Sequence, residues 1–395
     1  MESLRNRVAI IGAGCTPFRD YYDKDAEDLL VEACFEALGD AGIGTGDVQA
    51  AWLGGSSEAG FLLGRSLKLN FVPVTEVNSW CATGGDAFRN AAFAVAAGIY
   101  DVVLAAGVTA HFDGQSLERG VFVGGTGGDQ TFGQRVTFGS RNAASTFATF
   151  VTRYAHHYGL GYEATKRALG RIAIKNYRNG VRNPLAYMRK EIDLDTYMNA
   201  PMISWPLGLH DCCVMPHGAA AVVLTRAELA KQFRDDFVLL RGQGMSTGTM
   251  QGRIDTAYDW VHFPENVIAV GQAYEMAGIK EPLKELDFAC LHDAFTVVEL
   301  VAYEDFGFAP RGKGGEYAQA GVFDMEGDLP VSPNGGLKSF GHAGSTPAKL
   351  YEAYKQLQGK CGERQVKGAS VALTHEQGGL PGMYVSLVNI FTARD

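Results

Sequence analysis

One cysteine stands where a protein can make a sulfur reactive. Cys81 lies at the predicted start of a helix, in the segment from Asn78 to Asp86. Unpaired backbone N–H groups and partial positive charge at a helix's amino end favour a thiolate, so this position predicts a lowered thiol pKa. The small residues from Thr83 to Gly85 would let an acyl group approach and let main-chain N–H groups face a developing oxyanion. Taken alone, the segment is also compatible with a buried structural cysteine.

Three histidines stand where they could activate that sulfur. His292 and His375 each follow a predicted strand, and His342 lies in a glycine-flanked turn before a predicted helix. Histidine is the usual base for a nucleophilic cysteine, and open α/β sheets place ligand-binding groups at strand ends. Each histidine singly could be a hydrogen-bonded structural residue, but three at matching positions favour catalysis. The remaining candidates lack metal-ligand spacing, so we expect structural roles and no metal for His156, His157, His210 and His217.

Alternating apolar runs and helical patterns must position these residues. The alternation predicts a layered α/β fold with a parallel core. The strands are expected at 8–11, 51–53, 102–106, 237–241, 288–291, 370–374 and 384–388, and the helices at 26–41, 82–97, 267–277, 297–306 and 347–357. The strand at 102–106 is continuously apolar, as expected for a strand buried on both faces.

The two halves of the chain repeat one pattern. A turn of small residues opens a helix that an apolar strand follows, at Cys81–Gly85 and again at Gly341–Ser345. We therefore interpret the chain as two copies of one α/β unit. Between about 111 and 205 the pattern changes to glycine-rich turns such as Gly124–Gly128, scattered aromatics and charged helices. The predicted domains are a first half at 1–115 and 206–240, an inserted loop domain at 116–205, and a second half at 241–395.

Composition excludes several classes of protein. The 395 residues carry a net charge of −9, which argues against a general nucleic-acid binder. Seven cysteines form an odd count without paired metal spacing and fit reduced, cytoplasmic thiols. The first residues are charged and no run of 18 apolar residues occurs, so neither a signal peptide nor a membrane span is expected. The 50 glycines, about twice average usage, predict tight turns and close backbone approaches.

Four segments, in this order and at these distances, resemble the thiolase superfamily, and most closely the sterol carrier protein type thiolases. The family's nucleophile loop resembles Asn78–Gly84, its His-Asp-Cys-Phe loop resembles His292–Phe295, and its Gly-His-Pro loop resembles Gly341–Ala343. Its last loop, Cys-x-Gly in classical thiolases and His-Asn in the sterol carrier branch, corresponds to His375–Gly379. The resemblance implies the thiolase fold, in which duplicated βαβαβαββ halves form a five-layered αβαβα structure with an inserted loop domain.

The resemblance also implies roles for these residues. Cys81 would take the acyl group as a thioester, and His342 would draw its proton. His292 would donate to the thioester oxygen of the substrate, and His375 would lie beside the reacting carbon. Backbone N–H groups of Cys81 and of a glycine near Gly378 would hold the acyl oxygen. Coenzyme A would be a substrate, no metal or redox cofactor is implied, and a homodimer or tetramer is expected. Many relatives pair with a small protein built from a zinc ribbon and an OB-fold.

Three positions depart from the family pattern. Ala294 stands where the sterol carrier branch has a cysteine thought to protonate the departing enolate, so either His375 transfers that proton or thiolysis is weak. Ala343 replaces a proline, and the bulky Trp80 adjoins the nucleophile. Both suggest a pocket reshaped for an unusual acyl group, bulky, aromatic or branched. The expected substrate contacts are Trp80, Met245, Ser246, Thr247, Ala294 and Phe295.

The sequence therefore predicts an acyl-CoA C-acyltransferase that cleaves a β-ketoacyl-CoA by coenzyme A-dependent thiolysis. Two alternatives stay open, a retro-aldol lyase acting on a β-hydroxyacyl-CoA and a non-catalytic acyl-CoA-binding subunit, the latter prompted by Ala294. A dinucleotide oxidoreductase is disfavoured. The stretch Val8–Gly14 resembles the opening of a nucleotide-binding strand, but Pro17 and the missing third glycine spoil the helix start that a pyrophosphate needs.

Overall fold

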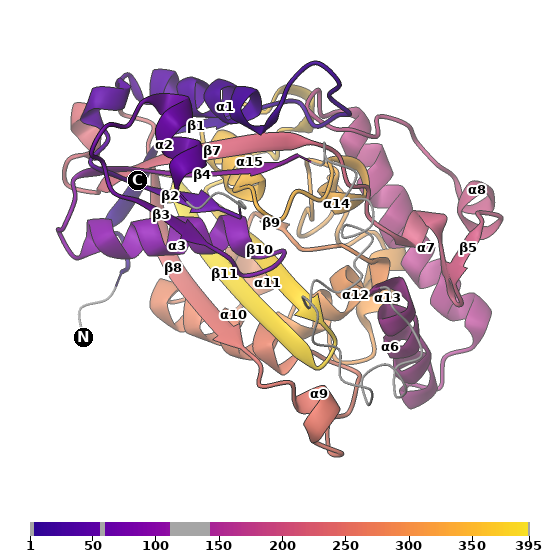
Figure 1. The fold of residues 1–395 in the computed structure, drawn as a ribbon. Helices are drawn as coiled ribbons and strands as arrows, with labels where there is room; N and C mark the ends of the chain where they lie inside the picture. The colour runs from indigo at the N-terminus through magenta and orange to yellow at the C-terminus, as the bar shows by residue number, and fades with distance from the viewer. Residues whose placement is uncertain (1–3, 56–59, 111–142, 394–395) are drawn as a thin grey trace.

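A mixed β-sheet organises the protein. The computed structural model describes residues 4–55, 60–110 and 143–393 (Figure 1). Within them, nine strands form one sheet in the order β3-β2-β4-β7-β1-β8-β11-β10-β9. Their bounds are β1 Val8–Cys15, β2 Ala50–Gly54, β3 Val74–Val77, β4 Val102–Thr109, β7 Gly218–Arg226, β8 Val238–Thr247, β9 Phe288–Cys290, β10 Val371–Leu380 and β11 Met383–Ala393.

The sheet confirms the predicted duplication. In the first half β1 lies antiparallel to β7, β7 antiparallel to β4, and β4 parallel to β2. In the second half β8, β11, β10 and β9 repeat these directions in the same order. The halves join where β1 pairs with β8. A counterpart of β3 is reduced to a bridge between Ala289 and Val331. The expected parallel core is therefore wrong in detail, because most neighbouring strands run antiparallel.

Helices pack on the sheet in layers. Helix α1 (Ala26–Ala41) packs on β1 and β7 above the first half in Figure 1, and α10 (Pro264–Ala277) packs on β8 and β11 below the second. Between the halves, one apolar cluster joins α3 (Thr83–Ala96) and α15 (Ala348–Leu357) to strands of both halves. Two further clusters lie under the outer helices. The arrangement is the five-layered αβαβα fold. No described helix combines the length and apolar character needed to cross a membrane.

The glycines that resembled a nucleotide-binding turn serve helix packing instead. Gly12 and Gly14 lie inside β1, which pairs antiparallel on both sides. A Cβ on Gly12 would lie 2.2 Å from the Ala37 carbonyl oxygen, and one on Gly14 would lie 2.1 Å from that of Ala33. Only glycine lets α1 approach the strand this closely.

Strand β10 runs further than predicted. It continues six residues beyond the expected end at 374, so His375 lies inside the strand and not past its end. The prediction was wrong because Glu376 and the two glycines of Gly378–Gly379 suggested a loop. Antiparallel pairing with β11 carries the strand through them, with His375 opposite Val388 and Gly378 opposite Val385. Successive side chains therefore point to opposite faces of the sheet.

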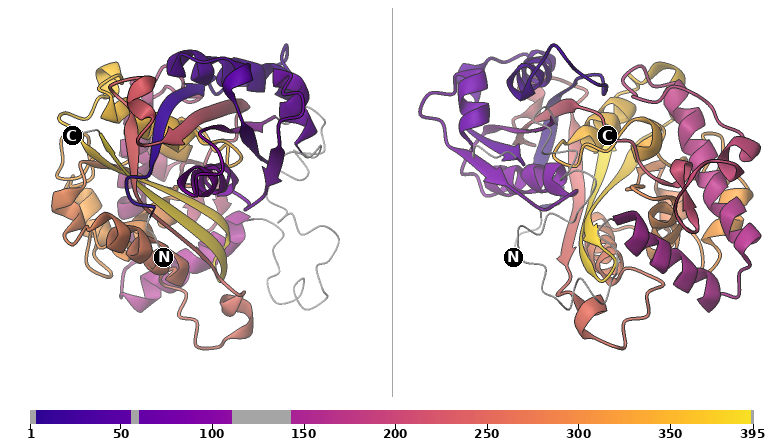
Figure 2. Two further views of the ribbon diagram at one scale, coloured as in Figure 1. Left: turned by 90° about the vertical axis from the view of Figure 1, so that its left-hand side faces the viewer. Right: turned by 45° about the vertical axis from the view of Figure 1, so that its right-hand side comes forward.

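The region of the predicted insertion contributes helices beside the second half. Residues 111–142, including Gly124–Gly128, lie outside the described residues. The described part forms α6 to α8 and a small hairpin, on the right of Figure 1. The remaining elements are α2 Phe61–Leu67, α6 Ala143–His157, α7 Tyr162–Val181, α8 Leu194–Met198, β5 Met202–Ser204, β6 Leu207–Gly208, α9 Gln251–Ile254, α11 Pro282–Glu285, α12 Thr296–Asp305, α13 Gly314–Gln319 and α14 Gly336–Ser339. Figure 2 shows the same helices from two further sides.

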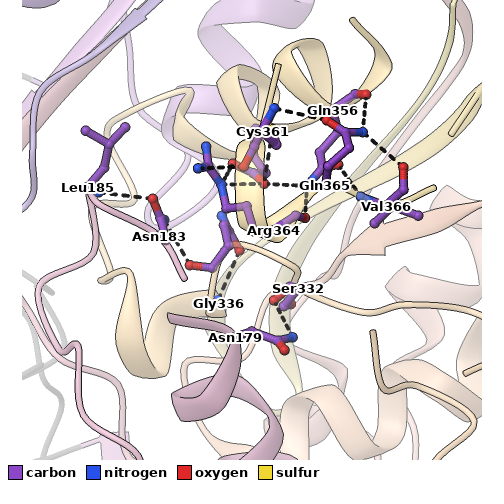
Figure 3. A network of polar contacts seen from close by, with 12 residues as sticks. Asn179, Asn183, Leu185, Ser332, Gly336, Gln356, Cys361, Arg364, Gln365 and Val366 are labelled. Atoms are coloured by element: carbon purple, nitrogen blue, oxygen red, sulfur yellow. Dashed lines mark hydrogen bonds and ion pairs between the residues drawn. The ribbon is translucent and has the colours of Figure 1, made fainter. Parts of the chain in front are cut away.

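Residues at and just beyond the end of α7 hold the loop at 332–336. The amide of Asn179 donates to the Ser332 carbonyl at 3.1 Å, and that of Asn183 donates to the Asn334 carbonyl at 3.0 Å (Figure 3). The Asn334 side chain in turn accepts the N–H of Gly336 at 3.0 Å. Because these donors are buried, the loop has few alternative conformations.

Candidate active site

The loop that carries Cys81 joins β3 to α3 in a constrained conformation. Trp80 has a φ of 56°, in the left-handed region that bulky residues rarely adopt. The Thr83 hydroxyl donates to the Trp80 carbonyl at 2.6 Å and accepts the Ser79 N–H at 2.8 Å. Backbone strain of this kind persists only where surrounding contacts hold it, and it concentrates at functional sites. Cys81 therefore sits on a fixed turn, two residues before the first residue of α3.

The loop that carries His342 packs directly on the Cys81 loop. The Gly84 N–H donates to the Gly344 carbonyl at 2.9 Å. A Cβ on Gly344 would lie 2.6 Å from the Cα of Cys81, and one on Gly84 would lie 2.2 Å from the Thr346 carbonyl. These contacts require glycine on both sides. The two turns that repeat in sequence thus meet at the boundary between the halves.

Three of the four predicted catalytic residues line one cavity. Cys81, His292 and His342 surround a volume of about 20 Å³ together with Lys349 and Glu376. The rings of His292 and His342 meet edge to face, with centroids 5.4 Å apart. A cavity of this size holds about one ordered water.

His375 is not among the residues that line the cavity. It is fully buried, its Nε2 lies 3.3 Å from the Ser386 hydroxyl, and its Nδ1 lies 3.5 Å from the His292 N–H. The ring of Phe306 packs edge to face against it at 4.8 Å. Both ring nitrogens of His375 are therefore engaged within the protein, on the face of β10 opposite to Glu376.

Glu376 is a cavity residue that sequence reasoning missed. It is 4% exposed, and neither carboxylate oxygen has a hydrogen-bond partner among the described residues. Burial raises the pKa of this carboxyl from its ordinary value near 4.5 to about 7, and the positive charge of Lys349 opposes that rise. Its carboxyl group lies against the first turn of α3, since a Cβ on Gly85 would lie 3.1 Å from the carboxyl carbon. Extending the two-residue alternation of β10 past Thr374 would have found it.

Burial also governs the sulfur. Cys81 keeps some exposed surface, but loss of hydration around it raises the pKa of its thiol to about 12. Lys349 and the backbone N–H groups of Cys81 and Gly379 oppose this rise. The predicted lowering of the thiol pKa was therefore wrong. The helix end contributes favourable charge, but dehydration outweighs it.

Two backbone N–H groups lie beside the sulfur, next to the glycine predicted for the oxyanion site. A Cβ on Gly378 would lie 3.1 Å from the Cys81 nitrogen and 2.5 Å from the Ser79 carbonyl oxygen. Gly379, the next residue, donates its N–H toward the sulfur alongside the N–H of Cys81. Two backbone donors thus converge at the nucleophile, where an acyl oxygen would develop negative charge.

His292 is held neutral and firmly placed. Burial, with the charges of Lys349, His342 and His375, lowers its pKa well below the ordinary value. Its neighbour Asp293 accepts the N–H of Leu337 at 2.6 Å and the amide of Asn176 at 2.9 Å. The Nδ1 of His292 has no hydrogen-bond partner within the part of the chain that the structure describes. A neutral imidazole can donate a hydrogen bond without adding charge.

The other predicted substrate contacts are not among the residues that line the cavity. The Ala294 carbonyl accepts the Cys213 N–H at 2.9 Å, and the ring of Phe295 stacks on Phe147 at 4.4 Å. Trp80 is 39% exposed beside the nucleophile. The end of β8 comprises Met245, Ser246 and Thr247.

Two of the histidines expected to be structural have partners within the fold. His210 lies 3.2 Å from the Tyr177 hydroxyl, and His217 accepts the Tyr21 N–H at 3.4 Å.

Known proteins share this architecture along the whole chain. The thiolase N-terminal domain matches residues 8–199, and the thiolase C-terminal domain-like family matches residues 246–390. An acetyl-CoA acetyltransferase of Methanothermobacter thermautotrophicus is 33% identical over 98% of this chain and 99% of its own. The chain belongs to the thiolase family. It is accordingly an enzyme of the acyltransferase class.

Two further proteins are similar to this thiolase, one in sequence and one in fold. A benzoylsuccinyl-CoA thiolase subunit, BbsB of Thauera aromatica, is 29% identical over 95% of this chain and 96% of its own. A solved chain of the Ltp2-ChsH2(DUF35) aldolase superposes with a TM-score of 0.83, at 24% identity and 99% coverage of both chains, and shows the same fold.

Proposed function

We propose that this thiolase cleaves a β-ketoacyl-CoA by coenzyme A-dependent thiolysis, through an acyl-enzyme on Cys81. The observation that carries the proposal is the shared cavity of Cys81, His292 and His342. Retro-aldol cleavage has no step that needs a nucleophilic sulfur, whereas thiolysis cannot proceed without one.

The chemistry follows from the positions of these groups. His342 takes the thiol proton as the sulfur attacks the β-ketone carbon, and the N–H groups of Cys81 and Gly379 stabilise the resulting oxyanion. The bond between carbons 2 and 3 then breaks, its electrons pass to carbon 2 as an enolate, and the acyl group stays on the sulfur. His292 donates to the thioester oxygen on which the enolate charge gathers. Protonation of carbon 2 releases an acyl-CoA.

The second half of the reaction regenerates the enzyme. The thiol of free coenzyme A loses its proton and attacks the acyl-enzyme carbonyl, which forms a second acyl-CoA and frees the Cys81 sulfur. No redox change occurs, so the proposal needs no redox cofactor. The proton lost by coenzyme A equals the proton gained by carbon 2.

The acyl group that we propose is bulky, aromatic or branched. Trp80, exposed beside the nucleophile, offers an apolar wall to such a group. The relative named as a benzoylsuccinyl-CoA thiolase subunit supports an aromatic acyl group. The subunit designation of that relative, and the second component named with the aldolase, support a partner protein for this chain. We propose that this partner is the small zinc-ribbon and OB-fold protein that the sequence resemblance implies, and that this chain forms a homo-oligomer.

Intact-protein mass spectrometry tests the proposal. The protein is incubated with acetyl-CoA, isobutyryl-CoA, benzoyl-CoA and matching β-ketoacyl-CoAs, and peptide mapping locates any adduct. We expect a thioester on Cys81 that free coenzyme A removes, and none in Cys81→Ser. Absence of an adduct across the panel, with or without co-purifying protein, would contradict the proposal. Full cleavage of a β-hydroxyacyl-CoA by Cys81→Ala would establish the lyase instead.

A further inference from the structure

Thiolysis requires an acid that the predicted site does not supply. Carbon 2 of the departing enolate must receive a proton, and a base must take the proton of coenzyme A. Ala294 has no proton to give, and both ring nitrogens of His375 face groups within the protein. His342 is already assigned to the thiol of Cys81. A further titratable group must therefore reach the reacting atoms.

Glu376 is positioned for this task. It lines the cavity with Cys81, His292 and His342, and it comes from a strand whose pairing fixes its direction. Its carboxyl group rests on the glycine face of α3, where a Cβ at Gly85 would lie only 3.1 Å from the carboxyl carbon. The catalytic sulfur and the carboxylate thus lie at the same helix end, on two halves of the duplicated fold.

Burial of the Glu376 carboxyl group lowers the stability of the folded protein, which is unexpected for a group without a function. Both oxygens are buried without a hydrogen-bond partner among the described residues, although buried carboxylates are ordinarily paired. The charged or titratable groups that face it are Lys349 on α15, His292 and Cys290 at the end of β9, His342 before α15 and Cys81 before α3. Only Lys349 offers a full positive charge. Unsatisfied buried groups of this kind concentrate at active sites.

We propose that Glu376 is the catalytic acid and base of the reaction. Its carboxylic acid gives a proton to carbon 2 of the enolate and becomes a carboxylate. That carboxylate then takes the thiol proton of the incoming coenzyme A, which restores the acid. In the synthetic direction the same carboxylate removes a proton from carbon 2 of an acyl-CoA. Burial brings its pKa to about 7, so both forms are present near neutral pH, as a group serving both roles requires.

Two half-reactions separate this role from the proposed function on which it rests. Acylation of Cys81 by p-nitrophenyl acetate needs no proton from Glu376, because nitrophenolate leaves unprotonated, whereas exchange of the carbon 2 protons of acetyl-CoA with deuterated water needs Glu376 as the base. In Glu376→Gln, we expect acylation within about threefold of wild type and exchange reduced by about 100-fold or more. Glu376→Asp, which withdraws the carboxylate by one methylene, should recover part of the exchange.

The controls assign each failure to its cause. Glu36→Gln, a carboxyl-to-amide change on the outer helix α1, should leave both half-reactions unchanged. Wild-type exchange should rise with pH to a plateau above about 7, and Glu376→Gln should lose that inflection. Exchange at the wild-type rate in Glu376→Gln, or a parallel fall of acylation and exchange, would overturn the role of Glu376. Failure of the wild-type protein to form any acyl-enzyme would instead overturn the proposed function.

Discussion

Replacing Glu376 by glutamine should make this protein more stable while it makes the enzyme inactive. The carboxylate is buried without a hydrogen-bond partner among the described residues, so the folded state bears the cost of its charge. Glutamine has nearly the same size and carries no charge. The substitution therefore removes that cost without opening a cavity, and the expected gain depends on pH.

The magnitude follows from the pKa. The pKa of Glu376 is about 7 in the folded protein and near 4.5 ordinarily, so the folded state binds this proton more tightly than the unfolded state does. The stability associated with the group is complete below pH 4.5 and falls as the pH rises through 7. Each tenfold difference in proton affinity is worth about 1.4 kcal/mol, which gives a loss of about 3 kcal/mol above pH 7.

Urea unfolding of wild type and Glu376→Gln at pH 5 and pH 8 measures this difference. We expect the variant to exceed wild type by about 3 kcal/mol at pH 8 and by less than about 1 kcal/mol at pH 5. Glu352 is a matched control, because it is also buried but pairs with Arg364 at 3.1 Å. Glu352→Gln should lose about 3 kcal/mol. A Glu376→Gln variant less stable than wild type at pH 8 would refute this account of the carboxylate.

Three further predictions concern the loops around the sulfur. Gly344→Ala places a Cβ 2.6 Å from the Cα of Cys81, so the two loops must move apart. The turnover rate should therefore fall by about 100-fold. As a control, Gly271→Ala in α10 should keep wild-type turnover, because its Cβ would meet nothing within 4 Å. The rate at which iodoacetamide alkylates Cys81, followed by peptide mapping, should rise about tenfold per pH unit between roughly pH 7 and 9, because the pKa of the thiol is about 12. A rate that stays constant with pH would contradict this and reveal a preformed thiolate–imidazolium pair. The Asp293 carboxylate accepts three buried N–H groups, and Asp293→Asn weakens these hydrogen bonds. The melting temperature of this variant should therefore fall by several degrees, and an unchanged melting temperature would contradict the prediction.

Local sequence patterns were enough to predict the helices and turns that hold the site. The helix at 26–41 and the boundaries of α3 and α15 follow from apolar periodicity and small-residue turns, which depend on neighbours in sequence. The repeated turns at Cys81 and Gly341 predicted a duplicated unit, and the sheet order confirms it. The strand at 371–380 was cut short, because glycines that end a strand in isolation are tolerated when a partner strand pairs with them.

The sequence by itself was enough to predict the class of chemistry and to determine the family. The residue types of Cys81, His292 and His342, and the motifs around them, predict a nucleophile and the groups that assist it without knowledge of their distances. Only the tertiary structure decided which residue completes the set. Whether His375 or Glu376 faces the sulfur depends on a single step along β10, and the pairing of that strand with β11 fixes the step. The pKa values likewise depend on burial between the two halves, which no local pattern specifies.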